Sequence, residues 1–69
     1  MTDQFLGQLV RKERTQLGLT QIEFAKKSKV GTNTVRKLEQ GIRPKKDALD
    51  KILYTIGYQI VEQLVKIEK

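Results

Sequence analysis

Residues 17–41 read LGLTQIEFAKKSKVGTNTVRKLEQG, and this stretch decides the fold that we predict for the chain. Thr20 is a favourable helix N-cap, and Glu23, three positions later, is spaced to bond back to the cap amide. This capping box predicts that a helix begins at the threonine and places Phe24 on the inward face of that helix. We therefore expect a short amphipathic helix over residues 20–27.

A second short helix is predicted after a polar turn at residues 28–31, which contains one apolar side chain, Val30. Beyond the turn, Val35 and Leu38 form an apolar pair at helical spacing, which predicts a helix over residues 31–40. Two short helices joined by a tight turn form a helix-turn-helix. In that arrangement we expect Val30 to fill the angle between the two helices.

One further helix is predicted on each side of this pair. An apolar stripe on the N-terminal side predicts a helix over about residues 2–17, and a similar pattern on the C-terminal side predicts one over residues 46–56. The stripe of the first helix consists of Leu6, Val10 and Leu17. The inward residues of the last helix are Leu49, Ile52, Leu53 and Ile56. Residues 1–57 are thus expected to form one all-α domain of four helices.

The tail, residues 58–69, has β-branched residues that favour a strand and a spacing that also suits an amphipathic helix. We expect a strand that begins at Tyr58 and pairs with the same strand of a second copy, because a single chain offers it no other strand. A helix in the same place would also need its apolar side covered. Both alternatives therefore predict a homodimer. The expected interface residues are Tyr58, Ile60, Val61 and Leu64.

The composition argues against several classes of function. The chain of 69 residues contains no cysteine and no histidine, so disulfides, the usual metal ligands and a Ser-His-Asp arrangement are excluded. Its 5 glycines occur singly and do not form a phosphate-binding loop. We expect no enzyme activity, no cofactor and no metal. The longest apolar runs are far shorter than a membrane span, so a soluble, cytoplasmic protein with no membrane partner is expected.

The excess positive charge is concentrated in one segment. Residues 26–51 contain nine basic and three acidic residues, which accounts for the whole net charge of +6, and the two ends together are neutral. Such concentration is typical of a polyanion-binding surface. A solvated basic face that serves solubility would give the same charge distribution, so charge alone does not separate these two interpretations.

The outward face of the helix predicted over residues 31–40 carries side chains suited to DNA bases. Asparagine can bond two edge atoms of adenine, arginine and lysine can reach the acceptors of guanine, and threonine offers a hydroxyl and a methyl group. The candidate base-contacting residues are Thr32, Asn33, Arg36 and Lys37. They lie at or near the N-terminal half of the helix, where a recognition helix makes its contacts. A loop at residues 42–46, with one proline and three positive charges, follows this helix.

Several elements together resemble the helix-turn-helix of the Cro and phage-repressor class, also called the xenobiotic-response-element class. The matching elements are Leu17-Gly18-Leu19-Thr20-Gln21, Phe24-Ala25, Val30, Val35 and Leu38-Glu39-Gln40-Gly41. The resemblance covers about residues 5–57 and implies a lambda-repressor-like domain. Within the class, residues 35–41 and 56–58 are similar to short antitoxins of the HipB-like type, in which a terminal strand pairs across the dimer.

The resemblance also implies roles for particular positions. Gln21 would bind a phosphate and brace the recognition helix, and Arg14 and Glu39 match a buried ion pair that ties the first helix to the end of the third. The remaining positions that match phosphate contacts are Gly31, Gln40, Arg43, Lys45 and Lys46. One departure concerns Gly31, since the class has a serine or threonine there that caps the helix and bonds a phosphate. Only the backbone amide is left for that contact.

Three functions from different classes remain open. The first, which we favour, is a transcriptional repressor that binds a palindromic operator as a dimer and serves as the antitoxin of a toxin–antitoxin pair, with a HipA-like kinase or another toxin as its partner. The second is a phage or mobile-element repressor without a toxin. The third is a protein-bridging adaptor on a helix-turn-helix scaffold. Ile22, on a partly exposed face of its helix, is a candidate for a protein contact.

Overall fold

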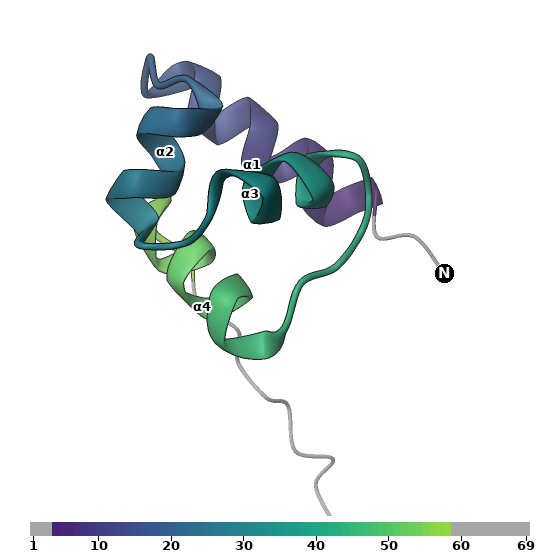
Figure 1. Cartoon of the computed structure of the whole chain (residues 1–69). Coiled ribbons are helices and arrows are strands. Elements are labelled where there is room, and N and C mark those ends of the chain that lie inside the picture. The colour runs from purple at the N-terminus through teal and green to yellow at the C-terminus, as the bar shows by residue number, and fades with distance from the viewer. Residues whose placement is uncertain (1–3, 59–69) are drawn as a thin grey trace, which may run out of the picture.

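The computed structural model describes residues 4–58, which form four helices and, within that range, no strand. The helices are α1 (Gln4–Gln16), α2 (Gln21–Ser28), α3 (Thr32–Glu39) and α4 (Lys46–Thr55). Helices α2 and α3 are joined by a short turn, α1 packs against α3, and α4 packs against α2 (Figure 1). The predicted all-α, four-helix fold is confirmed. The strand or helix expected in the tail, with Ile60, Val61 and Leu64, lies outside the described residues.

The core lies between the four helices, and each helix contributes to it. Its buried apolar residues are Val10, Phe24, Ala25, Val35, Leu38, Leu49, Ile52 and Leu53. Val30 packs against this cluster from the turn between α2 and α3, as expected for a residue that fills the angle between them. Because burying one large apolar side chain stabilises a fold by about 1.5–3 kcal/mol, these contacts fix the position of α3.

The inward stripe of α1 differs from the predicted one. The expectation that Leu17 faces the core is wrong, because α1 ends at Gln16 and the leucine side chain is 52% exposed in the turn that follows. Gly7 is buried in α1 and faces the backbone at the end of α3. A Cβ atom at this position would overlap the backbone carbonyl oxygen of Leu38. A glycine therefore allows the two helices to pack at this distance.

Local hydrogen bonds define both ends of α2. The Glu23 N–H donates to Thr20 Oγ1 at 3.1 Å, and the Thr20 N–H donates to Glu23 Oε1 at 2.8 Å, which completes the predicted capping box. At the other end Lys29 adopts a left-handed conformation with φ 62°. The Val30 N–H then donates to the Ala25 carbonyl at 3.0 Å and closes the turn that leads into α3.

We expect Lys29→Gly to raise the free energy of unfolding by about 0.5–1 kcal/mol. Lys29 is the only non-glycine residue with positive φ within residues 4–58, and the left-handed conformation costs an L-residue about 1–2 kcal/mol. Glycine removes that cost but adds backbone freedom to the unfolded chain, which offsets part of the gain. Urea denaturation measures the change. Lys26→Gly, within α2, is the control and should lower stability by about 1 kcal/mol. A destabilised Lys29→Gly variant would show that the turn is unstrained.

None of the four helices in the described part of the chain has the length and hydropathy needed to cross a bilayer.

Candidate nucleic-acid interface

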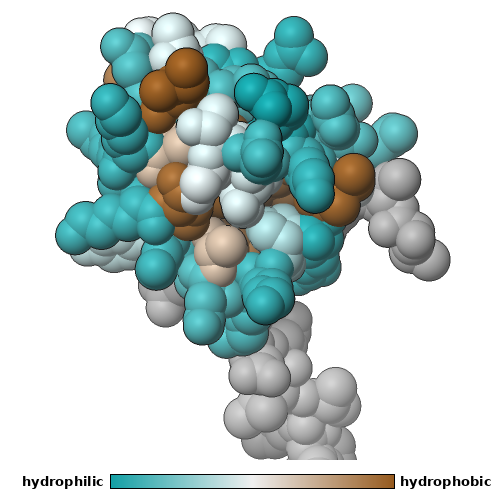
Figure 2. Space-filling view, in the orientation of Figure 1, coloured by the Kyte–Doolittle hydropathy of each residue, from teal (hydrophilic) through white to brown (hydrophobic). Residues whose placement is uncertain are grey.

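Helix α3 presents a polar face to solvent and an apolar face to the core. Val35 and Leu38 are fully buried, whereas Asn33, Arg36 and Lys37 are exposed. These three exposed residues are spaced i, i+3 and i+4, so they share one side of the helix. Figure 2 shows that hydrophilic side chains cover most of the molecular face on which α2 and α3 lie, with hydrophobic residues in a few separate spots. Three of the four predicted base-contacting side chains are therefore exposed on one side of the helix.

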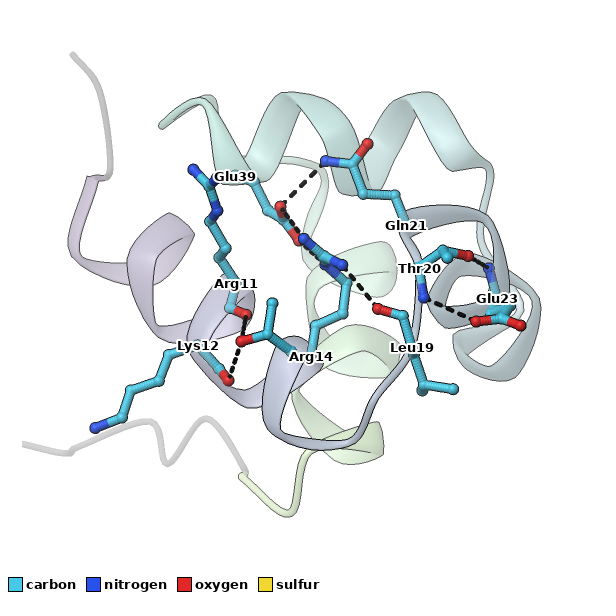
Figure 3. Close-up of polar contacts among 9 residues, drawn as sticks. Arg11, Lys12, Arg14, Leu19, Thr20, Gln21, Glu23 and Glu39 are labelled. Carbon is cyan, nitrogen blue, oxygen red and sulfur yellow. Dashed lines mark hydrogen bonds and ion pairs between the residues drawn. The ribbon is translucent and has the colours of Figure 1, made fainter.

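A polar network holds the C-terminal end of α3 against α1 (Figure 3). The Arg14 guanidinium donates from Nε to Glu39 Oε2 at 2.6 Å and from Nη2 to Glu39 Oε1 at 3.1 Å, and its Nη1 donates to the Leu19 carbonyl at 2.7 Å. The two side chains are only 12% and 5% exposed. A two-point arginine–carboxylate contact fixes geometry as well as distance. The structure thus forms the ion pair that the resemblance implied, and this pair ties α1 to α3.

Gln21, the first residue of α2, joins the same network. Its Nε2 donates to Glu39 Oε1 at 3.1 Å (Figure 3), so the glutamine braces α3 directly. A side-chain amide nitrogen carries two hydrogens, and the second can donate to a phosphate oxygen while the first stays on the carboxylate. The two roles that were expected of Gln21 are therefore compatible in one conformation.

The N-terminal end of α3 has no side-chain cap. Its N-cap residue is the exposed Gly31, with φ −74° and ψ 150°, and the carbonyl of this glycine accepts from the Thr34 N–H at 3.0 Å. Gly31 thus leaves α3 without the hydroxyl cap that is typical of the class, so no N-cap side chain accepts from the amides of the first turn. A phosphate at this end would contact backbone N–H groups alone.

A shallow depression of about 390 Å³ lies between α3 and the beginning of α4. It is lined by Thr34, Lys37, Ile42, Arg43, Pro44, Lys45 and Ala48. Lys37, a predicted base contact, therefore lies beside Arg43 and Lys45, which were predicted to bind phosphates. Three positive charges around one hollow create a field that attracts a polyanion.

The structure also locates the remaining candidate residues. Gln40 is the exposed C-cap of α3, and Lys46 begins α4, where its Nζ lies 3.6 Å from Asp50 Oδ2 in an exposed ion pair. Thr32 is half-buried at the first turn of α3, and Tyr58 is 45% exposed beyond α4.

Thr34 was not among the candidates, although it precedes Lys37 by one helical turn and lines the same depression. That spacing was the signal available in the sequence.

The comparisons with known proteins agree with this geometry. A family model described as Helix-turn-helix matches residues 10–68, a range that includes α2, the turn, α3 and α4. A comparison with curated proteins finds no match. The family match covers most of the chain and falls on the elements that present the polar face of α3. The chain therefore belongs to the helix-turn-helix family of the Cro and phage-repressor type, whose members are DNA-binding transcription regulators.

Proposed function

We propose that this protein is a sequence-specific repressor that binds a palindromic operator as a homodimer and acts as the antitoxin of a toxin–antitoxin pair, silencing its own operon. The observation that carries the DNA-binding part is the placement of Asn33, Arg36 and Lys37. Their side chains are exposed on one face of α3, while the opposite face is buried and the C-terminal end of the helix is held through Glu39. Such a fixed helix can enter the major groove with three side chains aimed at base edges.

We assign different tasks to the two groups of polar residues. The α3 group, which is Thr32, Asn33, Arg36 and Lys37, contacts bases. The second group, which is Gln21, Gly31, Gln40, Arg43, Lys45 and Lys46, contacts phosphates. This division is supported by where the groups lie, since the second group occupies the ends of helices and the loop around α3. Phosphate contacts set the register of a protein on DNA, and base contacts select the sequence.

The homodimer is proposed through the tail and the end of α4. Tyr54 is 82% exposed and Tyr58 is 45% exposed. Both precede, in the sequence, the apolar residues Ile60, Val61 and Leu64, which we propose as further members of the interface. Exposed aromatic side chains of this size are common in interfaces. A two-fold dimer would bind half-sites about one helical turn of DNA, or about 34 Å, apart.

The antitoxin role is the finer part of the proposal and has its own test. It is supported by the resemblance of residues 35–41 to short antitoxins and by Ile22, which is 56% exposed on α2 and available to a protein partner. Such a protein would work in the cytoplasm, at the chromosome. Co-expression with the product of the neighbouring gene, followed by affinity purification, should yield a stable complex. If no complex forms, the toxin-free repressor is the function that remains.

Selection of binding sites from random duplex DNA, followed by footprinting, tests the repressor role. We expect enrichment of one palindrome, and a protein that binds scrambled DNA equally well would contradict the proposal. The salt dependence of binding separates the repressor from an adaptor that does not use its basic surface. With several phosphates neutralised, the logarithm of the binding constant should fall with the logarithm of salt by about 0.9 per phosphate. A flat dependence would favour the adaptor.

Lys37→Ala and Lys45→Ala are expected to weaken DNA binding in different ways. Loss of Lys37 should cost about 1–3 kcal/mol on the best operator and relax the preference at one base position. Loss of Lys45 should weaken binding to all sequences alike and make the salt dependence shallower by the contribution of about one phosphate contact. Fluorescence anisotropy on the selected operator and on single-base variants measures both effects. Equal, sequence-independent losses in the two variants would contradict the assigned division of tasks.

A further inference from the structure

Two of the exposed side chains on α3 bond to each other. The Arg36 Nη1 donates to Asn33 Oδ1 at 2.7 Å. Both residues are exposed, and they are three positions apart on α3, so their side chains project from the same side of the helix. The pair lies on the face that we assign to DNA bases. Its hydrogen bond therefore determines what the two side chains offer to a base.

The hydrogen bond engages Oδ1, the one acceptor atom of the asparagine side chain, and takes one of its two lone pairs. To contact adenine at two points, an asparagine amide must accept from the N6 amino group while it donates to N7. In this protein Asn33 Oδ1 already accepts from a guanidinium. A hydrogen bond from a charged donor is about twice as strong as one from a neutral amino group, so the guanidinium keeps its place and adenine would have to share this oxygen with it. The guanidinium also places positive charge where the N6 amino group would approach.

Apart from the second lone pair of Asn33 Oδ1, which lies beside the guanidinium charge, the groups that remain are donors. Asn33 keeps the two hydrogens of its Nδ2, and Arg36 keeps its other N–H groups, because a guanidinium has five N–H donors and no acceptor. In the major groove guanine presents two acceptors, N7 and O6, whereas adenine presents one acceptor and one donor. A surface made mainly of donors, with a positive charge beside its one acceptor, matches the two acceptors of guanine better than the amino group of adenine.

We propose that Asn33 and Arg36 recognise DNA as one unit and that Arg36 sets the base preference of Asn33, turning an asparagine position from adenine to guanine. The inference rests on the proposed function, since it concerns the same face of α3. Arg36 is thus a specificity-determining residue, and its effect on Asn33 is separate from its contribution to the positive charge of the surface. Removal of the guanidinium takes its charge and its hydrogen bond away from Oδ1 and so favours two-point pairing of Asn33 with adenine.

Binding-site selection with four forms of the full chain tests this unit. Asn33→Ala identifies the base position that residue 33 contacts, because the preference relaxes there. The unaltered protein should select guanine at that position. Arg36→Met removes the guanidinium but keeps an unbranched side chain, and it should move the preference to adenine, changing the guanine-to-adenine affinity ratio by about tenfold or more. Lys45→Met removes one positive charge outside α3 and should lower affinity while the ratio stays constant.

Each result has a definite meaning. A tenfold change in the ratio for Arg36→Met, with none for Lys45→Met, supports the unit. Guanine preference that persists in Arg36→Met, or adenine preference in the unaltered protein, overturns the inference but leaves a sequence-specific DNA-binding protein. If the unaltered protein enriches no sequence, the proposed function fails and the inference fails with it. Circular dichroism shows whether each variant keeps its helices.

Discussion

Gly7→Ala is expected to lower the free energy of unfolding by about 2–3 kcal/mol, although alanine is the better helix former by about 1 kcal/mol. The added Cβ would overlap the Leu38 carbonyl oxygen and press on the backbone of Glu39. Both contacts are backbone atoms inside or at the end of α3, so no flexible side chain can move aside. To relieve the overlap, α1 must shift away from α3, which opens the core around Val10.

Thermal unfolding measures this loss. In a domain of this size, 1 kcal/mol corresponds to about 4–8 °C, so Tm should fall by roughly 10–20 °C. Gln8→Ala is the matched control, because it adds the same residue to the adjacent, exposed position of α1, and it should change stability by less than about 0.5 kcal/mol. If Gly7→Ala were as stable as the unaltered protein, or more stable, α1 and α3 would not pack at the distance described.

Glu39→Ala is expected to destabilise the fold by about 3–5 kcal/mol, the largest effect of a single polar substitution that we predict. The carboxylate accepts three hydrogen bonds, from two nitrogens of Arg14 and from Gln21. Its removal leaves a guanidinium that is only 12% exposed without its counter-charge. Removing one partner of a buried ion pair lowers the stability more than replacing both partners with apolar side chains, because the remaining charge stays poorly solvated.

A double-mutant cycle separates the pair from its parts. Arg14→Met combined with Glu39→Leu replaces both charges by apolar side chains and should recover most of the stability lost in either single variant. Asp50→Ala is the control, since it breaks an ion pair whose side chains are 72% and 44% exposed and should have little effect. Urea denaturation supplies the free energies of unfolding for the unaltered protein, for Arg14→Met and Glu39→Leu alone, for the double variant and for Asp50→Ala. Losses that simply add in the double variant would contradict a coupled network.

Features fixed by neighbouring residues were predictable from the sequence. The capping box of Thr20 and Glu23 needs only a spacing of three, and the apolar pair Val35 and Leu38 needs only helical periodicity. The helix boundaries that follow from such patterns differ by at most one residue at the C-terminal ends. The pair of Arg14 and Glu39, 25 residues apart, came from the family resemblance, because no local pattern links such positions.

Features that depend on three-dimensional approach were not predictable. No local pattern shows why residue 7 must be glycine. The reason is its contact with the backbone at the end of α3, more than thirty residues later in the chain. The rules for helix ends favour glycine at the position of Lys29, so its left-handed conformation could not be expected from residue type. The bond between Arg36 and Asn33 depends on side-chain rotamers. The sequence therefore named candidate residues for the site but not which of their side chains contact one another.

The separation of the two faces of α3 has a consequence for how such a protein can diversify. Residues 33, 36 and 37 are exposed, while the core residues lie on the opposite side of the helix and the network at Glu39 lies at its C-terminal end. Substitutions at these three positions therefore cost the scaffold little. If these positions contact bases as we propose, new target sequences can be explored by mutation without loss of a folded protein. Libraries randomised at these positions should accordingly yield mostly folded clones.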